Sequence, residues 1–219
     1  MARSDASILG DFTGRIGNVI VYKLNGKTVM RIRPAGGKKK PTPKQKQSRE
    51  DFAHVMKYMQ SLNQILNTGF YDVTNGRYAF HSAFSANMKA YLDAGKPEGA
   101  EWLKLSEGKG AGAEELHLEP LEGNLFRITW GKPLGEGWWS HNDRVFVVAV
   151  NSTNELRPFT QSQTALRNQG EATIDVFQSS PGDEIHFFIF FQDVDRSLRR
   201  KNPRNVSSSQ WVGKMVMPE

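Results

Sequence analysis

The chain has 219 residues, no cysteine and a formal net charge of +6 at pH 7. Without cysteine it can form no disulfide, no thiolate metal site and no cysteine nucleophile. No apolar run approaches the ~20 residues of a membrane-spanning helix, and no apolar segment follows the first five residues as in a classical secretory signal. The charge is uneven, because residues 1–49 hold twelve lysines and arginines but only two acidic residues, Asp5 and Asp11.

Residues 1–43 are interpreted as a basic arm that contains a β-hairpin over 16–33. Two apolar runs flank Asn25-Gly26, a dipeptide that favours a two-residue type I′ turn because both central residues need a positive φ. A lone hairpin is only marginally stable in water, so this one must pack on its own chain or on a partner. The segment 34–43 is rich in proline and lysine and is expected to be an extended linker.

Residues 44–95 are predicted to be a helical segment. Thr42 is expected to cap the first helix, with Pro43 at its first position and Gly69 near its end. Apolar residues at three- and four-residue steps mark one buried stripe. They are Phe52, Val55, Met56, Met59, Leu62, Ile65 and Leu66. A second helix is expected over residues 81–92.

After a linker at 96–113, residues 114–219 are predicted to form a β-sandwich. Short strand-like segments follow one another without an intervening helix, which is typical of such folds. The expected strands lie at 116–118, 125–130, 145–150, 172–176, 185–191 and 211–216. The expected core residues are Trp130, Phe146, Phe187, Phe188, Ile189, Phe190 and Trp211. The fold class is therefore α+β: an N-terminal β-hairpin and helices, followed by an all-β immunoglobulin- or fibronectin-III-like sandwich.

Two basic clusters and a tryptophan pair are the candidate interaction sites. The first cluster, in the arm, is Lys23, Lys27, Arg31, Arg33, Lys38, Lys39, Lys40, Lys44, Lys46 and Arg49. The second, in the loop before the last strand, is Arg196, Arg199, Arg200, Lys201 and Arg204. The pair is Trp138 and Trp139, a candidate interface anchor. The first cluster suits a polyanion or an acidic protein surface. For both clusters simple solvation is the alternative, and for the tryptophans it is packing on the core.

No catalytic constellation stands out. The five histidines are scattered and none has the spacing of a metal-binding motif. The glycine-rich segment 108–112 lacks the spacing of a phosphate-binding loop. We therefore expect no enzymatic activity, no metal and no cofactor.

Short segments spread over nearly the whole chain carry a family resemblance. They are a Gly-rich hairpin entry, an arginine–proline exit, a Pro-Thr-Pro helix entry and several later segments, at residues 8–20, 26–31, 34, 41–45, 102–108, 128–130, 187–191 and 209–213. Together they resemble a family of uncharacterised proteins from Bacteroidota and their phages, a domain of unknown function. The resemblance implies a helical segment with a fibronectin-like sandwich, and it implies no activity and no catalytic residues.

The leading hypothesis is a structural or interaction protein that acts within a larger assembly, such as a phage virion. The sandwich would be its rigid body and the basic arm would dock on other proteins or on further copies, in the cytoplasm or in the virion. The alternative is a nucleic-acid-binding module that uses the same arm, with an affinity that falls steeply with salt. An enzyme whose pocket the sequence does not mark is the third alternative.

Overall fold

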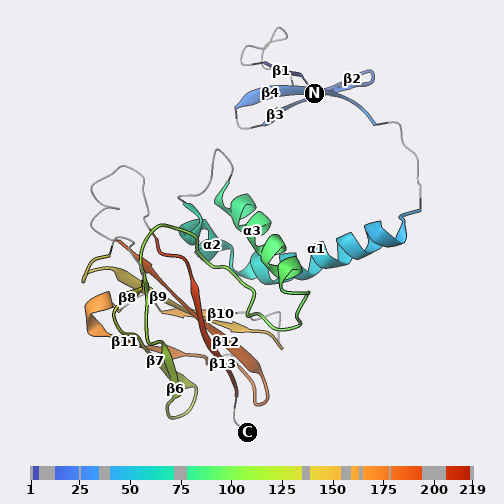
Figure 1. Ribbon diagram of the computed structural model, residues 1–219. Helices are drawn as coiled ribbons and strands as arrows, with labels where there is room; N and C mark the ends of the chain where they lie inside the picture. The colour runs from blue at the N-terminus through green and yellow to red at the C-terminus, as the bar shows by residue number, and fades with distance from the viewer. Residues whose placement is uncertain are drawn as a thin grey trace. The chain divides into compact units, whose positions relative to one another are not determined.

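The computed structural model describes residues 2–4, 13–24, 26–34, 40–71, 78–134, 139–153, 159–162, 165–177, 179–193 and 206–217. The chain divides into two units, which we call the N-terminal unit, Met1–Gln45, and the C-terminal unit, Lys46–Glu219. Figure 1 shows the elements of both.

The N-terminal unit is a four-stranded antiparallel sheet. Its strands are β1 (Ala2–Ser4), β2 (Gly14–Ile16), β3 (Val19–Leu24) and β4 (Lys27–Ile32), in the order β1-β4-β3-β2. The predicted hairpin is confirmed as β3 and β4, since Leu24 pairs with Lys27 across a two-residue turn. Gly26 in this turn has a φ of 75°, and Asn25 lies outside the described residues. The short strands β1 and β2 flank the hairpin, so the hairpin does not stand alone.

Three helices follow: α1 (Pro43–Ser61), α2 (Asn63–Gly69) and α3 (Ala79–Asp93). The predicted start is confirmed by a capping box, in which the Gln45 N–H donates to Thr42 Oγ1 and the Thr42 N–H donates to Gln45 Oε1. The single helix expected up to Gly69 is interrupted at Leu62, where α1 ends and α2 begins. The second predicted helix is confirmed as α3.

The strands that the structure describes in the C-terminal unit are paired in antiparallel fashion. They are β5 (Gly112–Ala113), β6 (His117–Pro120), β7 (Leu125–Thr129), β8 (Pro133–Leu134), β9 (Arg144–Asn151), β10 (Phe159–Ser162), β11 (Glu171–Asp175), β12 (Glu184–Gln192) and β13 (Gln210–Val216). Four strands form a sheet in the order β10-β9-β12-β13, three form a sheet in the order β11-β7-β6, and β5 pairs with β8. All six predicted strands are present, while β5, β8 and β10 were not expected. The α+β class with a C-terminal sandwich is confirmed.

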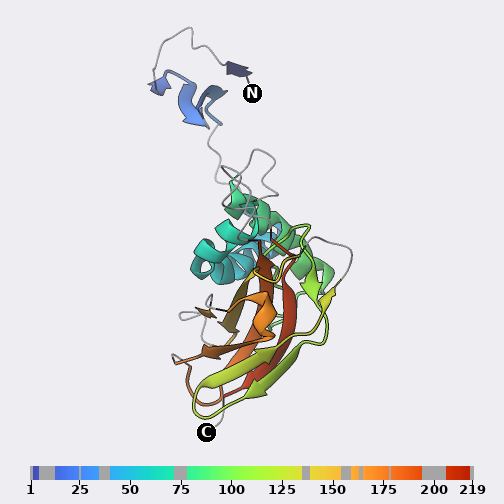
Figure 2. The same cartoon turned by 90° about the vertical axis from the view of Figure 1, so that its left-hand side faces the viewer.

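The two central strands of the four-stranded sheet, β9 and β12, are buried on both faces. One face of β9 and β12, with Phe187 and Ile189, shares a hydrophobic core with β7 and β11 of the three-stranded sheet. The other face, with Phe188 and Phe190, shares a second core with the three helices. In both views the helices gather on one side of the strands (Figures 1 and 2). Residues 46–95, treated in the sequence analysis as a segment apart from the sandwich, therefore belong to the same compact unit.

Residues 96–111, which we call the strap, connect α3 to β5 and are packed rather than loose. Trp102 and Leu105 are buried in the core beneath the helices. Asn87 of α3 is fully buried, and it donates to the Lys104 carbonyl and accepts from the Lys104 N–H at 2.9 and 2.8 Å. A Cβ on Gly69 would stand 2.1 Å from the Leu105 carbonyl oxygen, so only glycine permits this approach. The strap is therefore packed against the fold through its apolar side chains, while its charged side chains are exposed.

Two predicted core residues are half exposed. Phe52 is 49% exposed because it lies at the margin of the helical layer, where its ring contacts Phe84 with 4.8 Å between centroids. Trp211 is 46% exposed because β13 is the outer strand of its sheet. The other predicted core residues of the sandwich are buried.

Candidate functional site

The strand register gathers cationic side chains on one face of the N-terminal sheet. Ile20 pairs with Arg15 on one side and with Arg31 on the other, Tyr22 pairs with Val29, and Leu24 pairs with Lys27. Residues that pair directly, and residues two apart along a strand, share a face. We call this set the basic sheet face; it consists of Arg15, Ile20, Tyr22, Leu24, Lys27, Val29 and Arg31.

The basic sheet face combines exposed cations with one aromatic ring. Arg15, Lys27 and Arg31 are exposed, and the Arg31 guanidinium carbon lies 5.6 Å from the centroid of the Tyr22 ring. Arg15 Nε donates to the Gly17 carbonyl at 2.8 Å. Of the other predicted arm residues on this unit, Lys23 lies on the opposite face of the sheet. The structure therefore divides one predicted cluster between two faces.

The remaining arm cations that the structure describes follow β4 or belong to residues 40–49 at the start of α1. Arg33 follows β4 and is exposed, as is Lys40. Residues 42–50 are all exposed and contain the predicted Lys44, Lys46 and Arg49. The first turn of α1 holds no acidic residue, although a helix N-terminus favours negative charge. Lys38 and Lys39 lie outside the described residues.

The other two predicted sites fall mostly beyond the described ranges. The second basic loop, Arg196, Arg199, Arg200, Lys201 and Arg204, lies outside them, as does Trp138. Trp139 is 45% exposed, and its ring packs edge-on against His141 with 5.0 Å between centroids. Both sites remain predictions.

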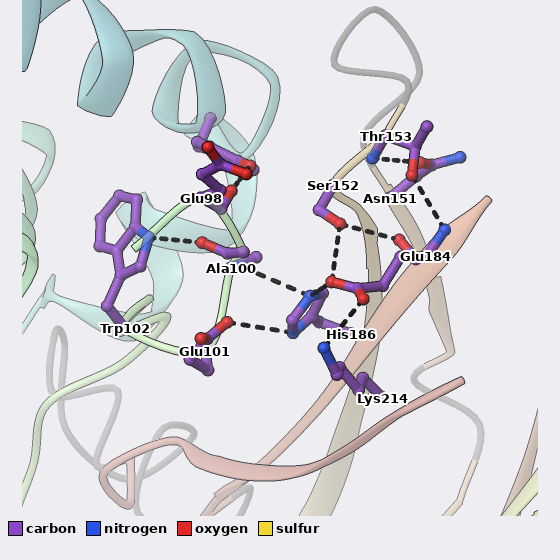
Figure 3. A network of polar contacts seen from close by, with 12 residues as sticks. Glu98, Ala100, Glu101, Trp102, Asn151, Ser152, Thr153, Glu184, His186 and Lys214 are labelled. Atoms are coloured by element: carbon purple, nitrogen blue, oxygen red, sulfur yellow. Dashed lines mark hydrogen bonds and ion pairs between the residues drawn. The ribbon is translucent and has the colours of Figure 1, made fainter. Parts of the chain in front are cut away.

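A polar network surrounds His186 of β12, which is fully buried (Figure 3). Its Nε2 lies 2.9 Å from Glu184 Oε1, so Nε2 carries a proton and donates to that carboxylate. The Ala100 N–H, 3.4 Å from the same nitrogen, then finds no acceptor there. His186 Nδ1 is 3.8 Å from Glu101 Oε2 and makes no hydrogen bond with any described residue. Lys214 Nζ completes the network by donating to Glu184 Oε2 at 2.9 Å.

The His186 network joins the strap to the sandwich rather than forming a nucleophile–base pair. Glu101 lies in the strap, Glu184 and His186 in β12, and Lys214 in β13. The hydroxyl of Ser152 donates to the Glu184 carbonyl at 3.1 Å, and no contact between Ser152 and His186 is present in this network. The imidazole is fully buried and has no surface exposed to solvent. The sequence marked His186 only by its place in an apolar strand.

Replacing Glu184 by glutamine is expected to lower the free energy of unfolding by about 1–3 kcal/mol at pH 7, because a charged acceptor is lost from two hydrogen bonds. Hydrogen bonds from Lys214 and then His186 hold the pKa of the Glu184 carboxyl below its ordinary 4.5. A lowered pKa stabilises the fold above the ordinary value and loses that effect as the pH falls through the lowered one. The difference from wild type should therefore narrow below about pH 4.5.

Urea unfolding at several pH values measures this difference. Glu171→Gln is the matched control, because the Glu171 carboxylate is 60% exposed and its ion pair with Arg127 lies on the surface. That control should change stability by less than about 1 kcal/mol. If the difference in unfolding free energy between Glu184→Gln and wild type does not narrow in acid, the lowered pKa of Glu184 is contradicted.

A second buried polar centre joins the strap to the sandwich at Arg167. Arg167 Nε lies 3.0 Å from Asp143 Oδ2, and its terminal nitrogens donate to the carbonyls of Gly112 and Ala111. The guanidinium lies 3.7 Å over the Phe191 ring. Burial raises the pKa of Asp143 and lowers that of Arg167, so each charge depends on the other. Neither residue stands in a periodic pattern, and the sequence analysis missed both.

Little else in the described residues suggests chemistry. An open depression of about 550 Å³ beside β11 is lined by Ala165, Gln169, Glu171, Ala172 and Thr173. Its one ionisable group, Glu171, faces Arg127. Within the described ranges, no three histidine or carboxylate side chains gather as metal ligands would, and no helix is long and apolar enough to cross a membrane.

A comparison with curated proteins found no match. A family model does match, and it covers residues 11–203, from before β2 to beyond the end of β12. The match therefore includes strands of the N-terminal sheet, the helices and most of the sandwich. The chain belongs to DUF6266, a family of unknown function.

Proposed function

We propose that this protein is a non-enzymatic interaction protein that acts within a larger assembly and docks there through its basic N-terminal region. The observation that carries the proposal is the separate N-terminal unit, whose sheet presents three exposed cations on one face. The sequence holds no acidic residue between Phe12 and Arg49, so this region as a whole attracts negative charge.

In this proposal the C-terminal unit is the rigid body that is held in the assembly. Its two hydrophobic cores and its buried polar centres at Arg167 and His186 are used to hold strands, helices and strap together. The resemblance to proteins of Bacteroidota and their phages favours a virion as the assembly, with a cytoplasmic particle as the other setting. The partners would be other proteins or further copies of this chain.

The test is sedimentation of the full-length tagged protein from its native source on a density gradient, with and without nuclease. A fast, nuclease-resistant fraction is expected, and its other components can be identified by mass spectrometry. Slow sedimentation in both gradients would refute the assembly role.

A second candidate function is a nucleic-acid-binding module. The concentration of cations in residues 12–49 favours it, since phosphate binding needs only dense positive charge. In the gradient, this function alone would give a fast fraction that nuclease converts to a slow one. In solution, the affinity for nucleic acid would fall steeply with salt.

A further inference from the structure

We infer that the basic sheet face binds single-stranded nucleic acid, with phosphates on Arg15, Lys27 and Arg31 and a base against Tyr22. The inference rests on the second candidate function, nucleic-acid binding by the N-terminal region, and it names the kind of nucleic acid and the residues that bind it. The inference goes beyond charge, because it assigns the Tyr22 ring to base stacking. A purely electrostatic contact would use only the cations.

The register places Tyr22 at the centre of the three cations. On β4, Tyr22 pairs with Val29, so Lys27 and Arg31 are its two diagonal neighbours. On the other side, Arg15 of β2 pairs with Ile20 and is therefore also diagonal to Tyr22. Diagonal neighbours in a sheet lie about 7–8 Å apart, within reach of long and aromatic side chains. The Arg31 guanidinium already lies over the Tyr22 ring.

This arrangement matches the chemistry of a single strand. Proteins that bind single strands combine cations that follow the backbone with aromatic rings or arginine planes on which bases stack. Four-stranded sheets with aromatic residues on their face recognise single-stranded RNA in this way. A duplex keeps its bases stacked inside and would leave the tyrosine unused, and an acidic protein surface would engage only the cations.

The opposite face of the sheet offers a matched control. It carries mainly apolar side chains, with Lys23 as its one lysine among the described strands β2 to β4. Lys23→Gln removes the same charge as Lys27→Gln or Arg31→Gln but from the wrong face. A general electrostatic attraction would respond equally to all three changes.

Fluorescence anisotropy of the full-length protein with a labelled 20-nucleotide oligo(dT) or oligo(U) tests the inference across a salt series. Wild type should bind, with an affinity that falls linearly with salt on logarithmic axes. Arg31→Gln should weaken binding about tenfold and reduce the salt slope by about 0.7. Tyr22→Ala should weaken it about tenfold and leave the slope unchanged, and Tyr22→Phe should restore it. Lys23→Gln should change affinity less than threefold.

Several results would overturn the inference: no binding at 50 mM salt, equal loss with Lys23→Gln, or equal affinity for a duplex or for polyglutamate. Circular dichroism of each variant checks folding, and Arg31→Gln, an exposed substitution, keeps the test decisive if Tyr22→Ala does not fold. If the oligonucleotide does not bind but the protein still sediments fast from its source, this inference fails and the assembly role stands. If the oligonucleotide binds tightly but the protein sediments slowly from its source, this inference stands and the assembly role fails.

Discussion

Replacing Phe188 by alanine is expected to destabilise the whole C-terminal unit by about 3–5 kcal/mol. Phe188 is fully buried and belongs to the core that β9 and β12 share with the helices. Its truncation leaves a cavity between the helices and the sheet and removes packing contacts from both layers. Guanidinium denaturation followed by far-ultraviolet circular dichroism measures the change.

Two further variants make this measurement decisive. Phe187→Ala removes the next side chain of β12, which points into the other core, and should cost a similar amount in one cooperative transition. Phe177→Ala removes a ring that is 61% exposed and should change stability by no more than about 0.5 kcal/mol. If Phe188→Ala melted the helices in a separate, earlier transition, the helical layer would be an independent domain and the shared core would be refuted.

Arg167→Met is expected to cost about 3–5 kcal/mol, because it leaves the buried Asp143 carboxylate without its counter-ion. It also removes the donors to the Gly112 and Ala111 carbonyls, where the strap enters β5. Adding Asp143→Asn should recover part of the loss, since the neutral amide removes the buried charge and can still accept from the Ser140 N–H. Thermal unfolding of the single and double variants measures the coupling.

Arg127→Met is the control for this prediction. Arg127 lies on the surface of β7 and faces Glu119 and Glu171 at 4.0 and 3.6 Å, so the change should cost about 1 kcal/mol or less. If Arg127→Met and Arg167→Met lose the same stability, the buried ion pair contributes no more to stability than the surface pairs. A double variant no more stable than Arg167→Met would show that the lost hydrogen bonds, rather than the charge, dominate.

Features that depend on a few neighbouring residues could be predicted from the sequence. The turn at Asn25-Gly26 and the helix start at Thr42-Pro43 each rest on backbone preferences of two to four residues, and the structure has both the hairpin and the capping box. The strands of the sandwich were found because alternation and apolar runs are also local patterns. The excess of cations before Arg49 needed only counting, and it pointed to the N-terminal region as the candidate site.

The burial of β9 and β12 on both faces could be seen only in the tertiary structure. The apolar run in β12 is compatible with any buried strand, and nothing in it states that one face meets helices and the other meets strands. Residues 96–113 were predicted to be a linker, yet Trp102 and Leu105 of the strap are buried in the core, and Asn87 makes two hydrogen bonds with the Lys104 backbone. The buried ion pair between Arg167 and Asp143 joins residues 24 positions apart in the chain, and charged residues are ordinarily exposed.

The sequence by itself determined the class of this protein: a basic N-terminal hairpin, helices and a β-sandwich, because each follows from local preference and composition. Only the tertiary structure decided which cations share a face of the sheet. Lys23 and Lys27 belong to one cluster in the sequence, but the pleat of the sheet sends them to opposite faces. The same pairing places Arg15, from another strand, diagonal to Tyr22. Register depends on how strands pair over a distance, and no short stretch of residues encodes it.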